Sequence, residues 1–194
     1  MALSLEDIEP LFAAKGDRMY AGEPVTQLEH ALQSAQLAEQ SGAGAALVVA
    51  ALLHDLGHMV NDQGETPTLR GIDDRHEYVA LPFLRALFDE AVLQPIKLHV
   101  DAKRYLCARG HVAPGGSTIN GAQYWANLSA DSKRSLELQG GIFTDAEAQR
   151  FISQPHAQGA VSVRLWDDAA KIQNAKTAPL SHYLAIAETI ALRR

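Results

Sequence analysis

The chain contains few of the residues that build disulfide-linked or membrane-spanning proteins. Its single cysteine, Cys107, can form neither an internal disulfide nor a thiolate cluster, so we expect it to be a small buried apolar residue. The longest apolar run extends only from Ala45 to Leu53, which is too short to cross a bilayer. We therefore expect neither a disulfide-stabilised fold nor a membrane partner.

The chain also lacks an excess of positive charge. Because its formal net charge is −6, it has no general attraction for phosphate backbones, and we expect no nucleic-acid partner. Any phosphate-bearing substrate must be small and held by a few local cations. Residues 1–4 do not combine a basic region with an apolar core, so we expect no signal peptide and a cytoplasmic location.

The residues that are present are typical of one globular helical domain. Apolar residues make up 47% and charged residues 21% of a 194-residue chain, which suits a single core. Ala, Leu, Glu and Gln are frequent, whereas alternating β-branched residues are missing. We expect an all-α, single-domain helical bundle over residues 1–194, without strands.

Capping residues and glycines predict where the first helices begin and end. Ser4 precedes a short first helix, and Thr26 and Glu29 form a capping box that opens the second. The third is expected over 45–56, apolar on nearly all sides as a central helix of a bundle must be. Gly57 is expected to end it.

Prolines and glycines divide the rest of the chain. We expect a helix over 74–87 with a kink at Pro82, and another over 89–108 with a kink or break at Pro95. The stretch 110–121 is expected to be a loop, because it holds four glycines and a proline. Shorter helices are expected to begin near four further residues: Ala130, Thr144, Gly159 and His182.

The pair His54-Asp55 indicates a metal site. Two ligand-type side chains end the most apolar helix of the chain, and burying them costs several kcal/mol unless they are paired or metal-bound. Taken alone, such a pair is more often a helix end whose side chains reach solvent. The rest of the sequence decides between the two interpretations.

Other ligand-type residues lie on apolar helix faces. His76 and His99 are flanked at helical spacing by aliphatic residues, as is Asp167, and His30 lies early in the second helix. A lone histidine of this kind is usually a satisfied core residue. Several such residues in one small bundle are hard to satisfy separately, so we predict that they meet at a metal site. The predicted ligands are His30, His54, Asp55, His76, His99 and Asp167.

The order His30, His54-Asp55 and a distal Asp167 resembles the H…HD…D signature of the HD-domain superfamily, an all-helical metal-binding fold. The additional His76 and His99 resemble its two-metal members. That resemblance implies two adjacent ions bridged by Asp55. Most HD proteins are phosphohydrolases, so the signature alone does not select a reaction.

Longer segments resemble the PhnZ-type oxygenases within this superfamily. They are YAGE at 20–23, QLEH at 27–30, AALLHDLGH at 50–58, HVDAKRYL at 99–106, NLS at 127–129, LQGG at 138–141 and RLWD at 164–167. The resemblance implies two iron ions in the mixed-valent Fe(II)/Fe(III) state, with O2 as co-substrate. The implied reaction is oxidative C–P cleavage of a 1-hydroxy-2-aminoethylphosphonate, as the primary amine or N-trimethyl form, to phosphate plus glycine or glycine betaine. The stretches 61–74 and 110–121 depart from the pattern.

Several cations and donors are spaced to bind a phosphonate. Lys103 follows His99 by one helical turn, and Arg164 precedes Asp167 by a similar distance, so each shares a face with a ligand. His58 and Ser132 complete the predicted substrate-binding group, with His58 also a candidate catalytic residue. The alternative for Lys103 and Arg164 is a solvated surface charge.

The loop before the second helix carries two further candidates. By the resemblance, Tyr20 would be a gate at the second iron, and Glu23 would pair with the substrate ammonium. The alternative is an ordinary loop tyrosine and a solvated glutamate. A trimethylated amine would require carboxylates and aromatic faces instead. Besides Tyr20, the chain offers Tyr78, Asp73 and Asp74 for this purpose.

Two other functions remain open from the sequence. An HD-type phosphohydrolase could use the same ligands to generate hydroxide for attack on a small phosphomonoester or nucleotide. A non-catalytic sensing or scaffold module is the third possibility, although a scaffold gains nothing from buried ligand-type side chains. The sequence does not specify the oligomeric state.

Overall fold

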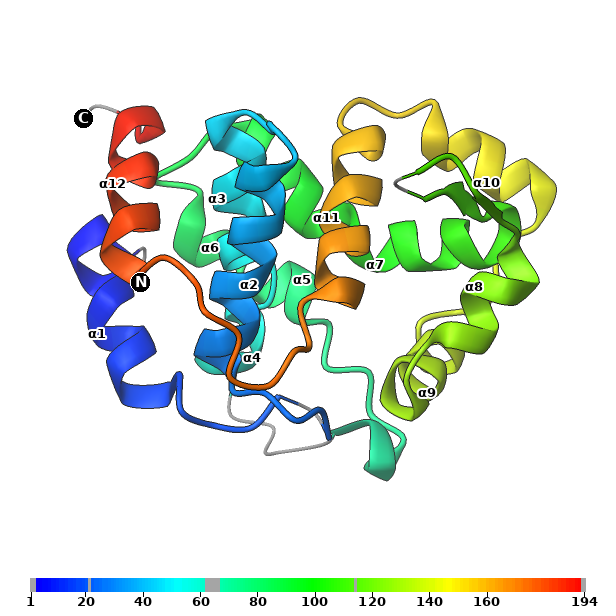
Figure 1. The fold of residues 1–194 in the computed structure, drawn as a ribbon, viewed down its shortest axis with the longest axis horizontal. Helices are drawn as coiled ribbons and strands as arrows, with labels where there is room; N and C mark the ends of the chain where they lie inside the picture. Colours follow the sequence, from blue (N-terminus) through cyan, green and yellow to red (C-terminus); the bar gives the residue numbers. More distant parts are fainter. Residues whose placement is uncertain (1–2, 21, 62–66, 114, 193–194) are drawn as a thin grey trace.

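The computed structural model of the protein describes residues 3–20, 22–61, 67–113 and 115–192. Within these ranges it is a bundle of helices with one two-stranded hairpin (Figure 1). The prediction of an all-α bundle is confirmed, whereas the expectation that the chain has no strands is wrong at this hairpin. Residues 1–2, Ala21 and the part of the 61–74 stretch that covers 62–66 lie outside the described residues. None of the helices in the described ranges is long and apolar enough to span a bilayer.

The first half of the chain supplies mostly short helices. They are α1 (Leu5–Lys15), α2 (Gln27–Gln40), α3 (Ala45–Leu53), α4 (Leu56–Val60), the 3-10 helix η1 (Pro67–Arg70), α5 (His76–Val79) and α6 (Leu81–Leu84). The predicted capping box of α2 is confirmed, because Glu29 N–H donates to Thr26 Oγ1 and Thr26 N–H donates to the Glu29 carboxylate, at 3.1 and 2.8 Å.

The second half contains one long helix and a series of shorter elements. They are α7 (Glu90–Arg109), β1 (His111–Val112), β2 (Thr118–Ile119), α8 (Gly121–Asn127), α9 (Ala130–Leu138), α10 (Asp145–Ile152), α11 (Ala157–Ala169) and α12 (Leu180–Ile190). The starts predicted near Ala130 and Thr144 are confirmed, and those near Gly159 and His182 lie two residues inside the observed helices.

The helix predicted over 45–56 is wrong at its end. It stops at Leu53, and Asp55, with φ −100° and ψ 11°, leaves the helical region before α4 begins. Gly57 lies inside α4 instead of ending a helix. A Cβ on Gly57 would come within 2.0 Å of the His76 carbonyl oxygen, so the glycine is required for the close contact between α4 and α5.

The single helix predicted over 74–87 is also wrong. The chain forms two one-turn helices there, because Arg75 adopts a left-handed conformation (φ 50°) before α5 and Pro82 lies in the first turn of α6, where no donor is lost. Pro95, by contrast, does not break α7. Its ring packs beside Gly159 of α11, so tertiary packing stabilises the helix through this point.

The loop predicted over 110–121 contains regular structure. His111 pairs with Ile119 and Val112 with Thr118 in an antiparallel hairpin, and α8 begins at Gly121. Asn120 caps α8 by accepting a hydrogen bond from Gln123 N–H, a short-range signal that the glycine content of the stretch obscured.

The buried apolar residues form two clusters that share the helices α7 and α11. The first core joins α1, α2, α3, α6 and α12, whereas the second core joins α8, α9 and α10 (Figure 1). On α7, Ile96 belongs to the first core and Leu106 to the second. On α11, Val163 belongs to the first core and Ala160 to the second. A cavity can therefore form between the cores, beside two helices that are anchored on both sides.

Candidate metal centre and substrate cavity

All of the predicted metal ligands come together in two groups of mutually adjacent donor atoms. The first group is His30, His54, Asp55 and Asp167, and the second is Asp55, His76 and His99. Every one of these side chains is buried, with at most 8% of the residue exposed. The alternative in which His54-Asp55 is a solvated helix end is wrong.

Different elements of the bundle supply these side chains. His30 lies in the first turns of α2, and His54 caps the C-terminus of α3. His76 opens α5, and His99 lies in the middle of α7. Asp167 lies near the end of α11. Because α7 and α11 contribute to both cores, His99 and Asp167 lie on helices that are packed on two sides.

Backbone carbonyls orient three of the imidazoles. His30 donates from Nδ1 to the carbonyl of Ala170 at 2.9 Å, while His54 and His99 donate to the carbonyls three residues before them, at 2.8 and 2.6 Å. A carbonyl oxygen only accepts hydrogen bonds, so Nδ1 must carry the proton in each ring. The Nε2 atoms are left to face inward, which is the arrangement of metal-binding histidines.

The inward Nε2 atoms lie in two close pairs, and each pair needs a proton or a metal ion between its members. His30 and His54 approach to 3.3 Å between Nε2 atoms, and His76 and His99 to 3.0 Å. Burial lowers the pKa of His30 to about 4, and burial together with His76 holds the pKa of His99 well below its ordinary value. Facing lone pairs at these distances repel, so a proton or a metal ion must lie between them.

Asp55 faces both imidazole pairs. Its Oδ2 lies 3.5 Å from His30 Nε2 and 3.4 Å from His54 Nε2, and its Oδ1 lies 3.3 Å from His76 Nε2 and 3.7 Å from His99 Nε2. Oδ2 is buried and has no hydrogen-bond donor among the described residues. The donor set therefore fits two adjacent cations that share one carboxylate, and its imidazole and carboxylate composition suits iron, manganese or zinc.

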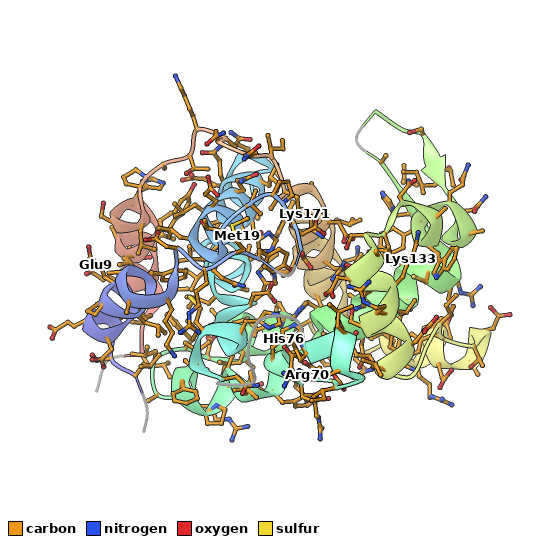
Figure 2. All side chains as sticks on the ribbon, turned by 90° about the horizontal axis from the view of Figure 1, so that it is seen from below. Glu9, Met19, Arg70, His76, Lys133 and Lys171 are labelled. Atoms are coloured by element: carbon orange, nitrogen blue, oxygen red, sulfur yellow. The ribbon has the colours of Figure 1, made fainter. Side chains whose placement is uncertain are left out.

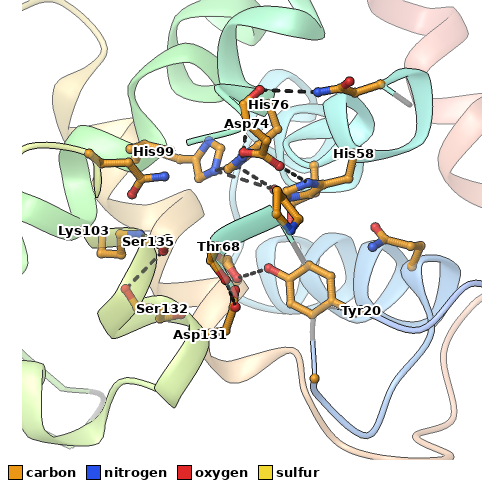
Figure 3. Close-up of a pocket in the computed structure, with 18 of the residues that line it drawn as sticks. Tyr20, His58, Thr68, Asp74, His76, His99, Lys103, Asp131, Ser132 and Ser135 are labelled. Atoms are coloured by element: carbon orange, nitrogen blue, oxygen red, sulfur yellow. Dashed lines mark hydrogen bonds and ion pairs between the residues drawn. The ribbon is translucent and has the colours of Figure 1, made fainter. Parts of the chain in front are cut away.

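A cavity of about 450 Å³ opens on this centre between the two cores (Figure 3). Its lining includes the predicted residues Tyr20, His58, Lys103, Ser132 and Arg164. In Figure 3 Lys103 and Ser132 lie on one side, opposite Tyr20 and His58. The structure thus brings these side chains to the same space as the metal ligands.

Tyr20 covers the first group of ligands. Its ring stacks on His30 with centroids 3.9 Å apart, and its hydroxyl lies 3.4 Å from Asp167 Oδ1. The structure therefore places Tyr20 at the first ligand group, not at the second group (Asp55, His76 and His99) where it was predicted, and its role as a gate stays a prediction.

His58 and Asp74 form a unit at the second group. Asp74 accepts from His58 Nδ1 at 2.7 Å and from His76 Nδ1 at 2.9 Å, so one carboxylate orients a ligand and a cavity imidazole. The two rings stack with centroids 4.1 Å apart, and His58 Nε2 lies 3.8 Å from Asp55 Oδ1. Sequence reasoning considered Asp74 only as a helix cap or an amine partner.

The predicted cations are buried, so the solvated alternative is wrong for both. Lys103 is 3% exposed and donates to Ser135 Oγ at 2.7 Å. Burial, and next the charge of Arg164, lower the pKa of Lys103 to about 7. Arg164 pairs with Asp167 at 2.8 Å and also with Asp168.

Sequence reasoning missed Ser135, which lines the cavity beside Lys103. It lies on α9 one turn after Ser132, so helical spacing from that residue could have found it. Arg18 and Gln139 also line the cavity and were missed.

Three residues considered for the substrate amine do not line the cavity. Glu23 forms an ion pair with Lys171 at 3.2 Å. Tyr78 is 41% exposed and stacks with Arg75, and Asp73 lies outside the lining as well.

Comparison with known proteins identifies relatives along nearly the whole chain. Residues 28–131 match the family model described as HD domain. A hydroxymethylphosphonate dioxygenase of Gimesia maris is 42% identical over 93% of this chain and 92% of its own length. A [1-hydroxy-2-(trimethylamino)ethyl]phosphonate dioxygenase (glycine-betaine-forming) of Leisingera caerulea is 35% identical over 92% of this chain and 86% of its own. An uncharacterized protein of Acanthamoeba polyphaga mimivirus is 31% identical over 89% and 75%.

Proposed function

The chain belongs to the HD domain family, among relatives that are phosphonate dioxygenases, and from this premise we propose that it is a di-iron oxygenase that cleaves the C–P bond of a 1-hydroxyphosphonate. The observation that carries the proposal is the shared Asp55 between two pairs of inward-facing Nε2 atoms. Those donors would hold two iron ions, which when bound supply the Lewis acid and redox chemistry that oxygen activation requires.

The cations on the far side of the cavity would bind the phosphonate. Lys103 and Arg164 place positive charge between the two cores, and a bound dianion would keep Lys103 protonated in spite of its burial. Ser132 would add a hydroxyl donor. These contacts fix the phosphorus end, so that the hydroxylated carbon faces the metal ligands.

His58 and Tyr20 would act on the other side of the substrate. The hydrogen bond from His58 Nδ1 to Asp74 directs Nε2 toward Asp55, where it can exchange a proton with the substrate's hydroxyl or phosphonate oxygens. Tyr20 lies over the first ligand group and would move aside when the substrate enters.

The candidate substrates differ in the group attached to the hydroxylated carbon. A 1-hydroxy-2-aminoethylphosphonate, as the primary amine or the N-trimethyl form, would give phosphate plus glycine or glycine betaine. Hydroxymethylphosphonate, which the name of the relative from Gimesia maris specifies, would give phosphate plus formate. Each reaction consumes one O2, whose atoms balance the oxidation of the carbon to a carboxylate.

Oxygen dependence tests the proposal. Protein loaded with ferrous iron should release phosphate from at least one of these phosphonates in air, and release should stop under anaerobic conditions. Phosphate released from a phosphomonoester equally well without oxygen would instead support a hydrolase. A protein that binds no metal and turns over neither class would support the scaffold alternative.

A further inference from the structure

The ion pair between Glu23 and Lys171 affects whether the protein can bind an amino group on the substrate. Both side chains are largely buried, with 15% and 16% of their surface exposed, and the pair distance is 3.2 Å. Lys171 Nζ also lies 5.8 Å from the centroid of the Tyr20 ring. Figure 2 shows Lys171 near the middle of the molecule, close to the segment that carries Met19. Glu23 is thus neutralised by an ammonium group of the protein itself.

The carboxylates that line the cavity also face hydrogen-bond donors or cationic groups of the protein. Among the described residues these are Asp55, Asp74, Asp131 and Asp167. Asp131 Oδ1 accepts from Thr68 Oγ1 at 2.5 Å and from Arg134 at 2.9 Å. The other three face imidazoles or a guanidinium group, as described above. Because Asp55 and Asp167 would hold the metal ions of the proposed function and Asp74 and Asp131 are paired, the described lining offers a cationic amine no free carboxylate.

The rest of the lining favours an anion with an uncharged substituent. Arg18 and Lys103 contribute positive charge, whereas the charge of Arg164 is offset by Asp167 and Asp168. Apart from imidazoles, Tyr20 is the aromatic ring of the described lining, and one of its faces is covered by His30. A trimethylammonium group requires several exposed aromatic faces, and the described lining does not provide them.

We infer that Lys171 is a specificity-determining residue that selects 1-hydroxyphosphonates without a cationic group, such as hydroxymethylphosphonate, over aminated ones. This inference rests on the proposed function. An aminated substrate could use Glu23 only by displacing Lys171, and it would bring a second positive charge beside it. One charge-assisted contact changes a binding constant by about tenfold to a hundredfold, which is the size of selectivity expected.

The experiment compares kcat/KM for phosphate release from hydroxymethylphosphonate and from 1-hydroxy-2-aminoethylphosphonate, using iron-loaded protein in air. The wild type should prefer hydroxymethylphosphonate by at least about tenfold. Lys171→Met frees the Glu23 carboxylate and should reduce this preference by about tenfold. Lys171→Arg should retain it, and adding Glu23→Gln to Lys171→Met should restore it.

Lys176→Met is the matched control, because it removes a lysine from the same segment at an exposed position. It should leave the preference unchanged. A wild type that prefers the aminated substrate would overturn the inference, as would a folded Lys171→Met protein with an unchanged preference. If Lys171→Met does not fold, the wild-type ratio still tests the preference, and Lys171→Gln, which also removes the charge, tests the role of Lys171 in its place. If no phosphonate releases phosphate in air, the proposed function itself fails, and this inference fails with it.

Discussion

The two sides of the cavity are built in different ways. On the side of the first core, the metal ligands are buried, and three of the four imidazoles are oriented by backbone carbonyls. On the side of the second core, Lys103 donates to the side chain of Ser135, which donates to the Ser132 carbonyl of its own helix. The metal side therefore has its geometry before any ligand arrives, whereas the anion side depends on charge and short hydrogen bonds. Substitutions on the two sides should consequently fail in different ways.

Asp55→Ala should have the largest effect. It removes the carboxylate that faces both imidazole pairs, so both ions should be lost together with all measurable turnover. Elemental analysis of the purified protein and phosphate release measure the two effects. Retention of two ions per chain would contradict the shared-carboxylate arrangement.

Asp74→Asn should have the next largest effect. The amide is nearly isosteric but cannot accept from His58 and His76 in the same way, because one of its two terminal atoms is a donor. Loss of such a partner typically weakens metal affinity by about 10- to 100-fold. Competition with a chelator measures the affinity of the ion at His76 and His99. Asp73→Asn is the control; equal losses in both variants would refute a specific role for Asp74.

The sequence predicts the metal side well because its signals are local. His54-Asp55 is a contiguous pair, and the aliphatic residues one helical turn from His99 predict that its side chain faces the core. The break after Leu53 was missed. Gly57, which was expected to end the helix, instead lies in a close contact with the His76 backbone, a tertiary feature that no neighbouring residue in the sequence indicates. The ligands were found in spite of the wrong helix end, since an error of three residues in helix length does not change which side chains must be buried.

The anion side is harder to read from the sequence, because its contacts join distant residues. The same difficulty applies to Glu23 and Lys171 beside Tyr20, because they are 148 positions apart and nothing near either residue indicates the pair. Ser135 lies on a helix of mostly polar residues, where a serine resembles ordinary surface. Ser135 belongs to the site because it accepts a hydrogen bond from Lys103, which is 32 positions away in the sequence. That contact becomes visible only when the packing of α9 beside the cavity is known.

Lys103→Met should lower kcat/KM for the phosphonate by about tenfold to a hundredfold without releasing metal, because it removes one charged contact. The wild type should also show a pH dependence that the variant lacks. The pKa of Lys103 is lowered to about 7, so the free enzyme loses this positive charge as the pH rises through 7, and kcat/KM should fall above it. Lys103→Arg, which stays protonated, should remove that fall. The substrate ionises in the same way in all three assays, so a difference between the pH profiles of kcat/KM reports the ionisation of Lys103.

Ser135→Ala should have the smallest effect and is the sharpest test of the comparison. The serine hydroxyl accepts from Lys103 and donates to the Ser132 carbonyl at 3.1 Å, so its loss leaves a buried ammonium with one partner fewer. A neutral hydrogen-bond partner contributes about 0.5 to 1.5 kcal/mol, which corresponds to a rise in KM of about two- to tenfold. The metal content should not change, because no carbonyl or carboxylate that orients a ligand is touched. Exposed Ser153, which bonds only within its own helix end, provides the control as Ser153→Ala. Loss of iron from Ser135→Ala would show that the two sides are coupled through Lys103, and the division between a preformed metal side and an adaptable anion side would then be wrong.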